Sequence, residues 1–142
     1  MRRLNILLVP LLTLVWTVAV AGANTTQLFG VWKIQSASIP MPKTCSKLSL
    51  QFLADGTYIG DDGSMVMRMK FDAVEDADGL TLIFSQNASI DGHENCQGLP
   101  LEYVRQHPPR NSLVRFDDNA KTMHLYFGPT EQSPYLVLMK QD

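Results

Sequence analysis

The sequence contains no motif that identifies a chemical activity by itself. It has no glycine-rich nucleotide-binding loop, no cluster of His, Cys, Asp and Glu at metal-ligand spacing, and no nucleophile with a suitably spaced histidine and acid. Low-complexity tracts and internal repeats are also missing. We therefore expect that the protein is not an enzyme and that it holds neither a cofactor nor a metal ion.

The first 23 residues have the pattern of a cleavable export signal. Arg2 and Arg3 form a basic start, an apolar run extends from Ile6 to Val20, and Ala21-Gly22-Ala23 supplies small residues for cleavage before Asn24. No cysteine follows directly, which argues against a lipid anchor. We predict a signal peptide over 1–23 and a periplasmic or secreted protein over 24–142, without a membrane span.

Charge and length narrow the partners and the number of domains. Without residues 1–23 the chain loses two of its 12 basic residues and none of its 14 acidic residues, so its net charge becomes 10 − 14 = −4. This balance argues against nucleic acid as a partner. The remaining 142 − 23 = 119 residues are enough for one hydrophobic core, and we predict a single domain.

Cysteine is scarce, and both cysteines lie beyond the predicted signal. In an oxidising compartment, Cys45 and Cys96 are most simply interpreted as one disulfide. Two distant cysteines give little support to a thiol or metal site. Asn24 and Asn87 begin Asn-x-Ser/Thr motifs, which are glycosylation acceptors only in a eukaryotic source.

Alternating hydrophobicity predicts an all-β fold. In Ser64 to Ala73, Met and Phe alternate with charged residues, which is typical of a strand with one solvated face. Helical periodicity is missing beyond 1–23, apart from one turn expected around Thr25 to Phe29. Such strands can pack as a sandwich or close into a barrel, and short turns such as Asp55-Gly56 favour an antiparallel up-and-down barrel of about eight strands. The other predicted strands are Val31 to Ser38, Lys47 to Leu53, Leu80 to Asn87, Leu101 to Gln106, Ser112 to Asp117, Thr122 to Gly128 and Tyr135 to Lys140.

Two short motifs resemble those of lipocalin-like domains. Leu28-Phe29-Gly30-Val31-Trp32 is similar to the Gly-x-Trp start of the first lipocalin strand, and the segment from Leu50 to Tyr58 resembles the hairpin that follows in bacterial members. Gly30 allows close approach of the backbone at the barrel floor, and Trp32 can plug one barrel end, so we expect both to be structural. The resemblance implies a small barrel that holds a hydrophobic small molecule.

We predict that this molecule contacts apolar side chains in the barrel interior. The predicted ligand-binding residues are Phe52, Met67, Met69, Phe84 and Tyr126.

Two alternatives remain open from the sequence. An exported inhibitor or immunity factor would bind another exported protein through the loops 39–44, 91–100 and 107–111. A Cu(I) protein would use Met65, Met67 and Met69, completed by His93, His124 or Trp32.

Overall fold

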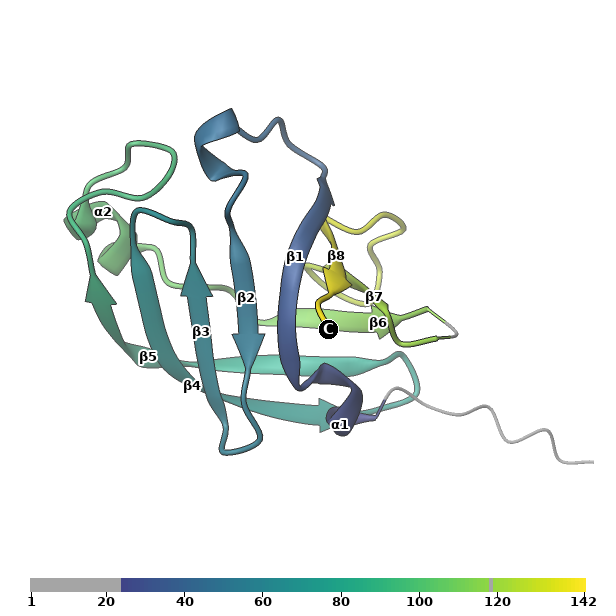
Figure 1. The fold of residues 1–142 in the computed structure, drawn as a ribbon. Coiled ribbons are helices and arrows are strands. Elements are labelled where there is room, and N and C mark those ends of the chain that lie inside the picture. The colour runs from purple at the N-terminus through teal and green to yellow at the C-terminus, as the bar shows by residue number, and fades with distance from the viewer. Residues whose placement is uncertain (1–23, 118) are drawn as a thin grey trace, which may run out of the picture.

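The chain forms a closed antiparallel barrel of eight strands in sequence order (Figure 1). A computed structural model describes residues 24–117 and 119–142, so the predicted signal peptide lies outside the described residues. The strands are β1 Gly30–Ala37, β2 Ser49–Phe52, β3 Thr57–Asp61, β4 Val66–Glu75, β5 Leu80–Asp91, β6 Ser112–Phe116, β7 Thr122–Tyr126 and β8 Leu136–Lys140. The short helices are α1 Thr25–Leu28, η1 Lys43–Cys45 and α2 Leu101–Gln106. The predicted all-β up-and-down barrel is confirmed.

Each strand pairs with its chain neighbours, and β1 pairs with β8 to close the barrel. Helix α1 lies at one end, and the loop between β1 and β2 lies at the other (Figure 1). We call the end opposite α1 the mouth, because β1 and β3 end there and β2 and β4 begin there. The two ends are therefore built differently, one from a helix that enters the first strand and the other from loops.

The barrel wall is not uniformly paired. Strand β5 pairs with β6 only over Leu80–Leu82, although β5 continues to Asp91. Its pairing with β4 shifts register between Met69 and Phe71, where the Lys70 amide donates to Ser85 Oγ at 3.2 Å. Helix α2 lies against β5 in the region where β6 no longer follows it (Figure 1).

One predicted strand is absent and one observed strand was not predicted, so the predicted number of strands still equals the observed number. The segment 101–106 is helix α2 and not a strand, because it follows Pro100 and places Leu101 and Val104 on one helical face. Strand β3 was missed because its five residues include Gly60 and lie between two Asp-Gly turns. The helical turn expected around Thr25 to Phe29 is present as α1.

Aromatic and aliphatic side chains fill the half of the barrel next to α1. Phe52 lies 5.2 Å from Phe71 and 5.3 Å from Tyr58 between ring centroids, and Tyr58 lies 5.1 Å from Phe84 in an edge-on contact. Such tilted pairs are favourable arrangements of aromatic rings. These rings belong to one buried core cluster to which all eight strands contribute.

Gly30 and Trp32 lie at the end closed by α1. Gly30 has φ +128°, a conformation that favours glycine, and a Cβ there would lie 3.1 Å from Lys140 Cε. The Trp32 side chain is fully buried, and its Nε1 donates to the Leu28 carbonyl at 2.7 Å. These contacts join α1 to the first strand.

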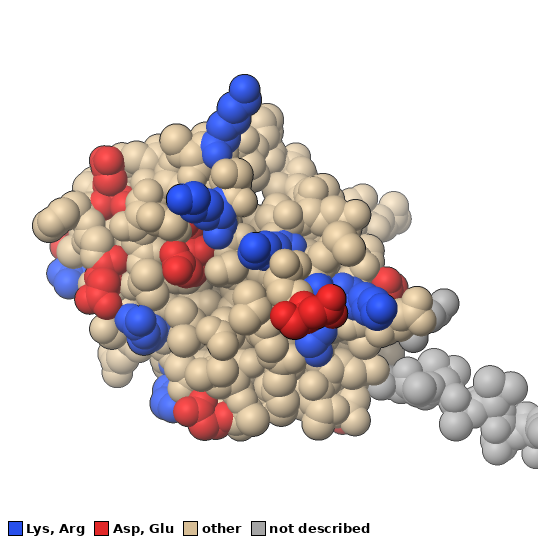
Figure 2. Space-filling model, in the orientation of Figure 1, with Lys and Arg blue, Asp and Glu red and all other residues tan. Residues whose placement is uncertain are grey.

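On the outer surface, charges of both signs are mixed. Figure 2 shows basic and acidic side chains interspersed over the face that carries β1 to β4. One ion pair within the described chain joins Arg68 and Asp91 at 3.0 Å, with both side chains largely exposed. Among the described residues, no helix has the length and apolar character needed to cross a membrane.

Candidate functional site

A disulfide joins two loops at the mouth. Cys45, at the end of η1, is bonded to Cys96 in the loop between β5 and α2, which confirms the predicted pairing. Thr44 Oγ1 also donates to the Cys96 carbonyl at 2.6 Å, and the Cys96 amide donates to Asp62 Oδ2 at 2.8 Å. Both loops are thereby fixed to each other and to the turn after β3.

Asp62 is held at the mouth by backbone donors. Its Oδ1 accepts hydrogen bonds from the Ser64 and Met65 amides, each at 2.8 Å, in addition to the bond from Cys96 to Oδ2. Three amide donors satisfy a carboxylate in its ionised form. Asp62 therefore places a fixed negative charge at the edge of the barrel mouth.

A cavity of about 350 Å³ opens between these loops, and we call it the mouth pocket. Its lining is mainly apolar, with backbone and amide groups from the disulfide loop on one side. The lining residues are Ser38, Ile39, Met41, Leu48, Asp62, Asn95, Cys96, Gln97, Phe127, Tyr135 and Leu136. The size and character fit a site for a small organic molecule.

The rim of the mouth pocket carries exposed apolar side chains. Ile39 is 61% exposed and Phe127 is 56% exposed. The Phe127 ring stacks on Tyr135 with centroids 4.2 Å apart. Large apolar side chains on the rim of an apolar cavity are typical of a surface that becomes covered on binding.

Hydroxyl groups line the interior beneath this rim. Tyr135 lies beside Ser112, with 2.8 Å between their hydroxyl oxygens, and Ser112 Oγ donates to the Arg110 carbonyl at 3.0 Å. Burial raises the pKa of Tyr135, although its hydrogen bond with Ser112 acts in the opposite direction. Tyr135 is therefore a neutral phenol at physiological pH.

Tyr58 is the second interior tyrosine. Burial raises the pKa of its hydroxyl well above the usual range, and the nearby Tyr135 raises it further. A Cβ at Gly60 would lie 2.8 Å from Tyr58 Oη, so the ring extends along β3 toward the mouth. The absence of a side chain at Gly60 makes room for this orientation.

The buried Tyr58 predicts a loss of stability at high pH. Below its ordinary pKa of 10.0 the phenol is neutral in both folded and unfolded chains; above it, only the unfolded chain ionises readily. The free energy of unfolding should then fall by about 1.4 kcal/mol per pH unit from this one group. Urea unfolding between about pH 9 and about pH 11 should show a shallower decline for Tyr58→Phe. An equally steep decline in that variant would contradict the assignment, and Tyr103→Phe on exposed α2 is the control.

The predicted ligand-binding residues lie apart from the mouth pocket. Phe52, Met69 and Phe84 belong to the buried core cluster, and Met67 packs against it. None of the five lines the mouth pocket. Met67 instead lines a smaller hollow beside α2, and Phe84 lines a groove on the barrel wall.

The prediction that Tyr126 faces the interior was wrong. Met123 and Leu125 are the buried residues of β7, so alternation places Tyr126 on the outer face. There its ring lies under the Arg115 guanidinium, with the central carbon 4.8 Å from the ring centroid.

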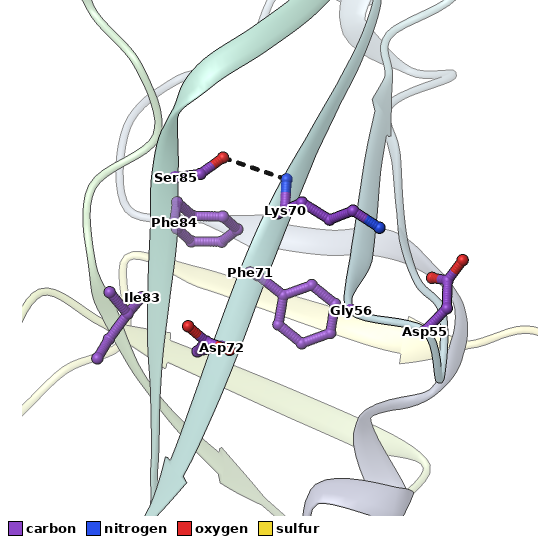
Figure 3. A pocket seen from close by; sticks show the side chains of 8 residues that line it. All are labelled: Asp55, Gly56, Lys70, Phe71, Asp72, Ile83, Phe84 and Ser85. Carbon is purple, nitrogen blue, oxygen red and sulfur yellow. Dashed lines mark hydrogen bonds between the residues drawn. The ribbon is translucent and has the colours of Figure 1, made fainter.

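The groove on the barrel wall lies beside the register shift between β4 and β5 (Figure 3). Phe71 and Phe84 line it, with Lys70 and Asp72 on β4 and Asp55 on the neighbouring turn (Figure 3). Its exposed apolar lining is smaller than that of the mouth pocket, and it carries three charged groups. We therefore regard the mouth pocket as the better candidate site.

The methionine segment is divided between two environments. Met69 is buried in the core cluster and Met67 packs against that cluster, whereas Met65 precedes β4 and lies beside Gly92. Two of the three thioethers thus belong to or pack on the core, which is the usual role of methionine in a barrel interior. No group of three or more His, Cys, Asp or Glu side chains is placed to hold a metal ion within 24–117 and 119–142.

The loops 39–44 and 91–100, which contribute to the mouth pocket, were proposed from the sequence for protein binding, but none of the pocket's residues was assigned to a small-molecule site. Ile39 and Met41 alternate with prolines in a segment outside any strand, and Phe127 and Tyr135 flank the loop before β8. Apolar residues in such loops are a usable signal, because a loop without a binding role has little reason to expose them.

Neither a family model, nor a curated protein, nor a solved structure matches this chain. The fold and the mouth pocket are therefore the basis for any functional proposal.

Proposed function

We propose that this protein is an exported, lipocalin-like binding protein that holds a hydrophobic small molecule in its mouth pocket. The observation that carries the proposal is a cavity of about 350 Å³ with an apolar lining, open at one end of a closed barrel. Binding in such a site requires burial of apolar ligand surface and no bond chemistry. The disulfide at the mouth supports the exported location, since such bonds persist in oxidising compartments.

Compared with the sequence prediction, the proposal moves the ligand from the barrel interior to the mouth. In this proposal Phe52, Met69 and Phe84 form the floor beneath the ligand, and most of the ligand surface contacts other residues. Aromatic packing in that floor keeps the lower barrel closed. The loops that hold the mouth pocket are preformed because the disulfide and Asp62 connect them.

A neutral fluorescent probe, N-phenyl-1-naphthylamine, tests the site directly. Ile39→Glu should weaken its binding about tenfold, because the variant removes apolar contact worth about 1.5 kcal/mol and adds a charge at the rim. Val74→Glu is the matched control, because Val74 is also β-branched and half exposed but lies on the outer face of β4. The dissociation constants are measured by fluorescence titration.

Equal affinities of the two variants, or no binding of the probe to the wild-type protein, would contradict the proposal. In that case the exposed rim would favour the alternative of an exported protein partner. Native mass spectrometry of protein purified from its own host gives an independent check. An organic adduct that disappears after solvent extraction is the expected result.

A further inference from the structure

The interior below the mouth pocket contains a hydroxyl group without a protein partner. Tyr58 is only 7% exposed, yet none of the hydrogen bonds among the described residues involves its Oη. Fully occluded side-chain oxygen and nitrogen atoms in the described chain all have partners. It follows that Tyr58 Oη is not fully occluded, and its position over Gly60 on the inward face of β3 places this opening in the barrel interior.

The direction of Tyr58 connects this opening with the mouth. The ring lies over Gly60, one inward position closer to the mouth along β3. Tyr58 packs edge-on against Phe84, whose amide donates to Asn111 Oδ1 at 3.3 Å. Asn111 precedes Ser112, which is hydrogen-bonded to Tyr135 on the lining of the mouth pocket. A molecule that fills the mouth pocket and extends inward therefore approaches both phenols.

Proton accounting gives these two phenols different roles. The single Ser112 hydroxyl proton is donated to the Arg110 carbonyl, so the proton between Ser112 and Tyr135 comes from Tyr135. Tyr135 then offers only lone pairs to a ligand. Tyr58 retains a free proton, because no protein acceptor takes it. Together the phenols present one donor and one acceptor, which match a ligand hydroxyl group.

Charge at the site disfavours an ionised ligand head. Asp62 is the one charged side chain among the residues lining the mouth pocket, and its carboxylate is fixed by three amides. No cation stands among those lining residues to pair with a ligand carboxylate. A charged head placed beside neutral phenols in the interior would remain unpaired, which is costly.

Resting on the proposed function, we infer that the ligand is an uncharged amphiphile, with an apolar body in the mouth pocket and one hydroxyl or carbonyl oxygen held by Tyr58 and Tyr135. A carbonyl would accept from Tyr58 alone, whereas a hydroxyl would also donate to Tyr135. The neutral alcohol is therefore the preferred class.

Displacement of N-phenyl-1-naphthylamine by 1-decanol and by decanoate compares the effect of the two head groups on affinity, because the two competitors have the same chain length. Decanol should bind at least about tenfold more tightly than decanoate, and Tyr58→Phe should weaken decanol binding about fivefold, as expected for one lost hydrogen bond. Probe affinity is measured in the same variant as the reference for this change, because the probe's N–H cannot accept a hydrogen bond from a phenol. Tyr103→Phe on exposed α2 is the matched control and should change neither.

The outcomes distinguish this inference from the proposed function. If the probe binds but decanol affinity is the same in wild type and Tyr58→Phe, the role of the phenols is wrong while the mouth pocket stands. Tighter binding of decanoate than of decanol would also overturn the inference. If neither the probe nor decanol binds, the proposed function itself fails.

Discussion

Replacing Cys45 and Cys96 together by alanine is expected to lower the free energy of unfolding by about 4 kcal/mol. The two cysteines are separated by 51 positions, and releasing a loop of that length restores much conformational freedom to the unfolded chain. A small domain is stable by only about 5–15 kcal/mol, so the loss is a large fraction of the total. Urea unfolding followed by far-UV circular dichroism measures it.

Two comparisons isolate the covalent bond from its surroundings. Thr44→Val removes only the hydrogen bond to the Cys96 carbonyl and should cost about 1 kcal/mol. A reducing agent should destabilise the wild-type protein and leave the double-alanine variant unchanged, because that variant has no disulfide to reduce. A loss below about 1 kcal/mol in the double variant would show that the bond contributes little.

Truncation of Trp32 to alanine is expected to cost about 3–5 kcal/mol. The side chain is fully buried, its centroid lies 5.8 Å from that of Phe116, and the Lys140 ammonium lies 5.2 Å from the ring centroid. Removal leaves a cavity at the closed end and an unpaired Leu28 carbonyl. The free energy of unfolding is again measured by urea titration with circular dichroism, since the mutation removes a fluorophore.

Trp32→Phe separates packing from hydrogen bonding at the same position. It keeps an aromatic ring but loses the Nε1 donor to Leu28, and we expect it to cost about half as much as the alanine variant. Binding of the neutral probe at the mouth should persist in Trp32→Phe, because the tryptophan lies at the opposite end. A loss of probe binding without a loss of stability would contradict the conclusion that Trp32 and the mouth pocket lie at opposite ends of the barrel.

Much of the barrel could be predicted because its strands alternate clearly between buried and solvated residues. The long β4 shows this best, since Met69 and Phe71 are buried while Lys70 and Asp72 are exposed. The Asp-Gly turn before β5 placed its start at Leu80 correctly, whereas its end was predicted at Asn87 and lies at Asp91. Short segments could not be assigned in this way, because six residues such as 101–106 fit a strand or a helix equally well until Pro100 and the tertiary contacts decide.

The candidate site was harder to predict than the fold. In β7, Met123 and Leu125 alternate with His124 and Tyr126, and both sets contain bulky side chains, so the sequence alone does not determine which set faces inward. The mouth pocket combines loops that are distant in sequence and that the disulfide holds together. The role inferred for Tyr58 also needed the structure, because only the structure shows that its hydroxyl has no hydrogen-bond partner among the described residues.

The order of the strands has a consequence for how the chain folds. Every pairing in the barrel joins strands that follow one another along the chain, except the pairing of β1 with β8. Most hairpins between neighbours close small loops and form early and quickly, whereas a pairing between distant segments must overcome a larger loss of chain entropy. The pairing of Leu80–Leu82 on β5 with Ser112–Val114 on β6 also joins distant segments. The meander can thus assemble step by step, and the final seam between β1 and β8 is the event that turns an open, curved sheet into a barrel.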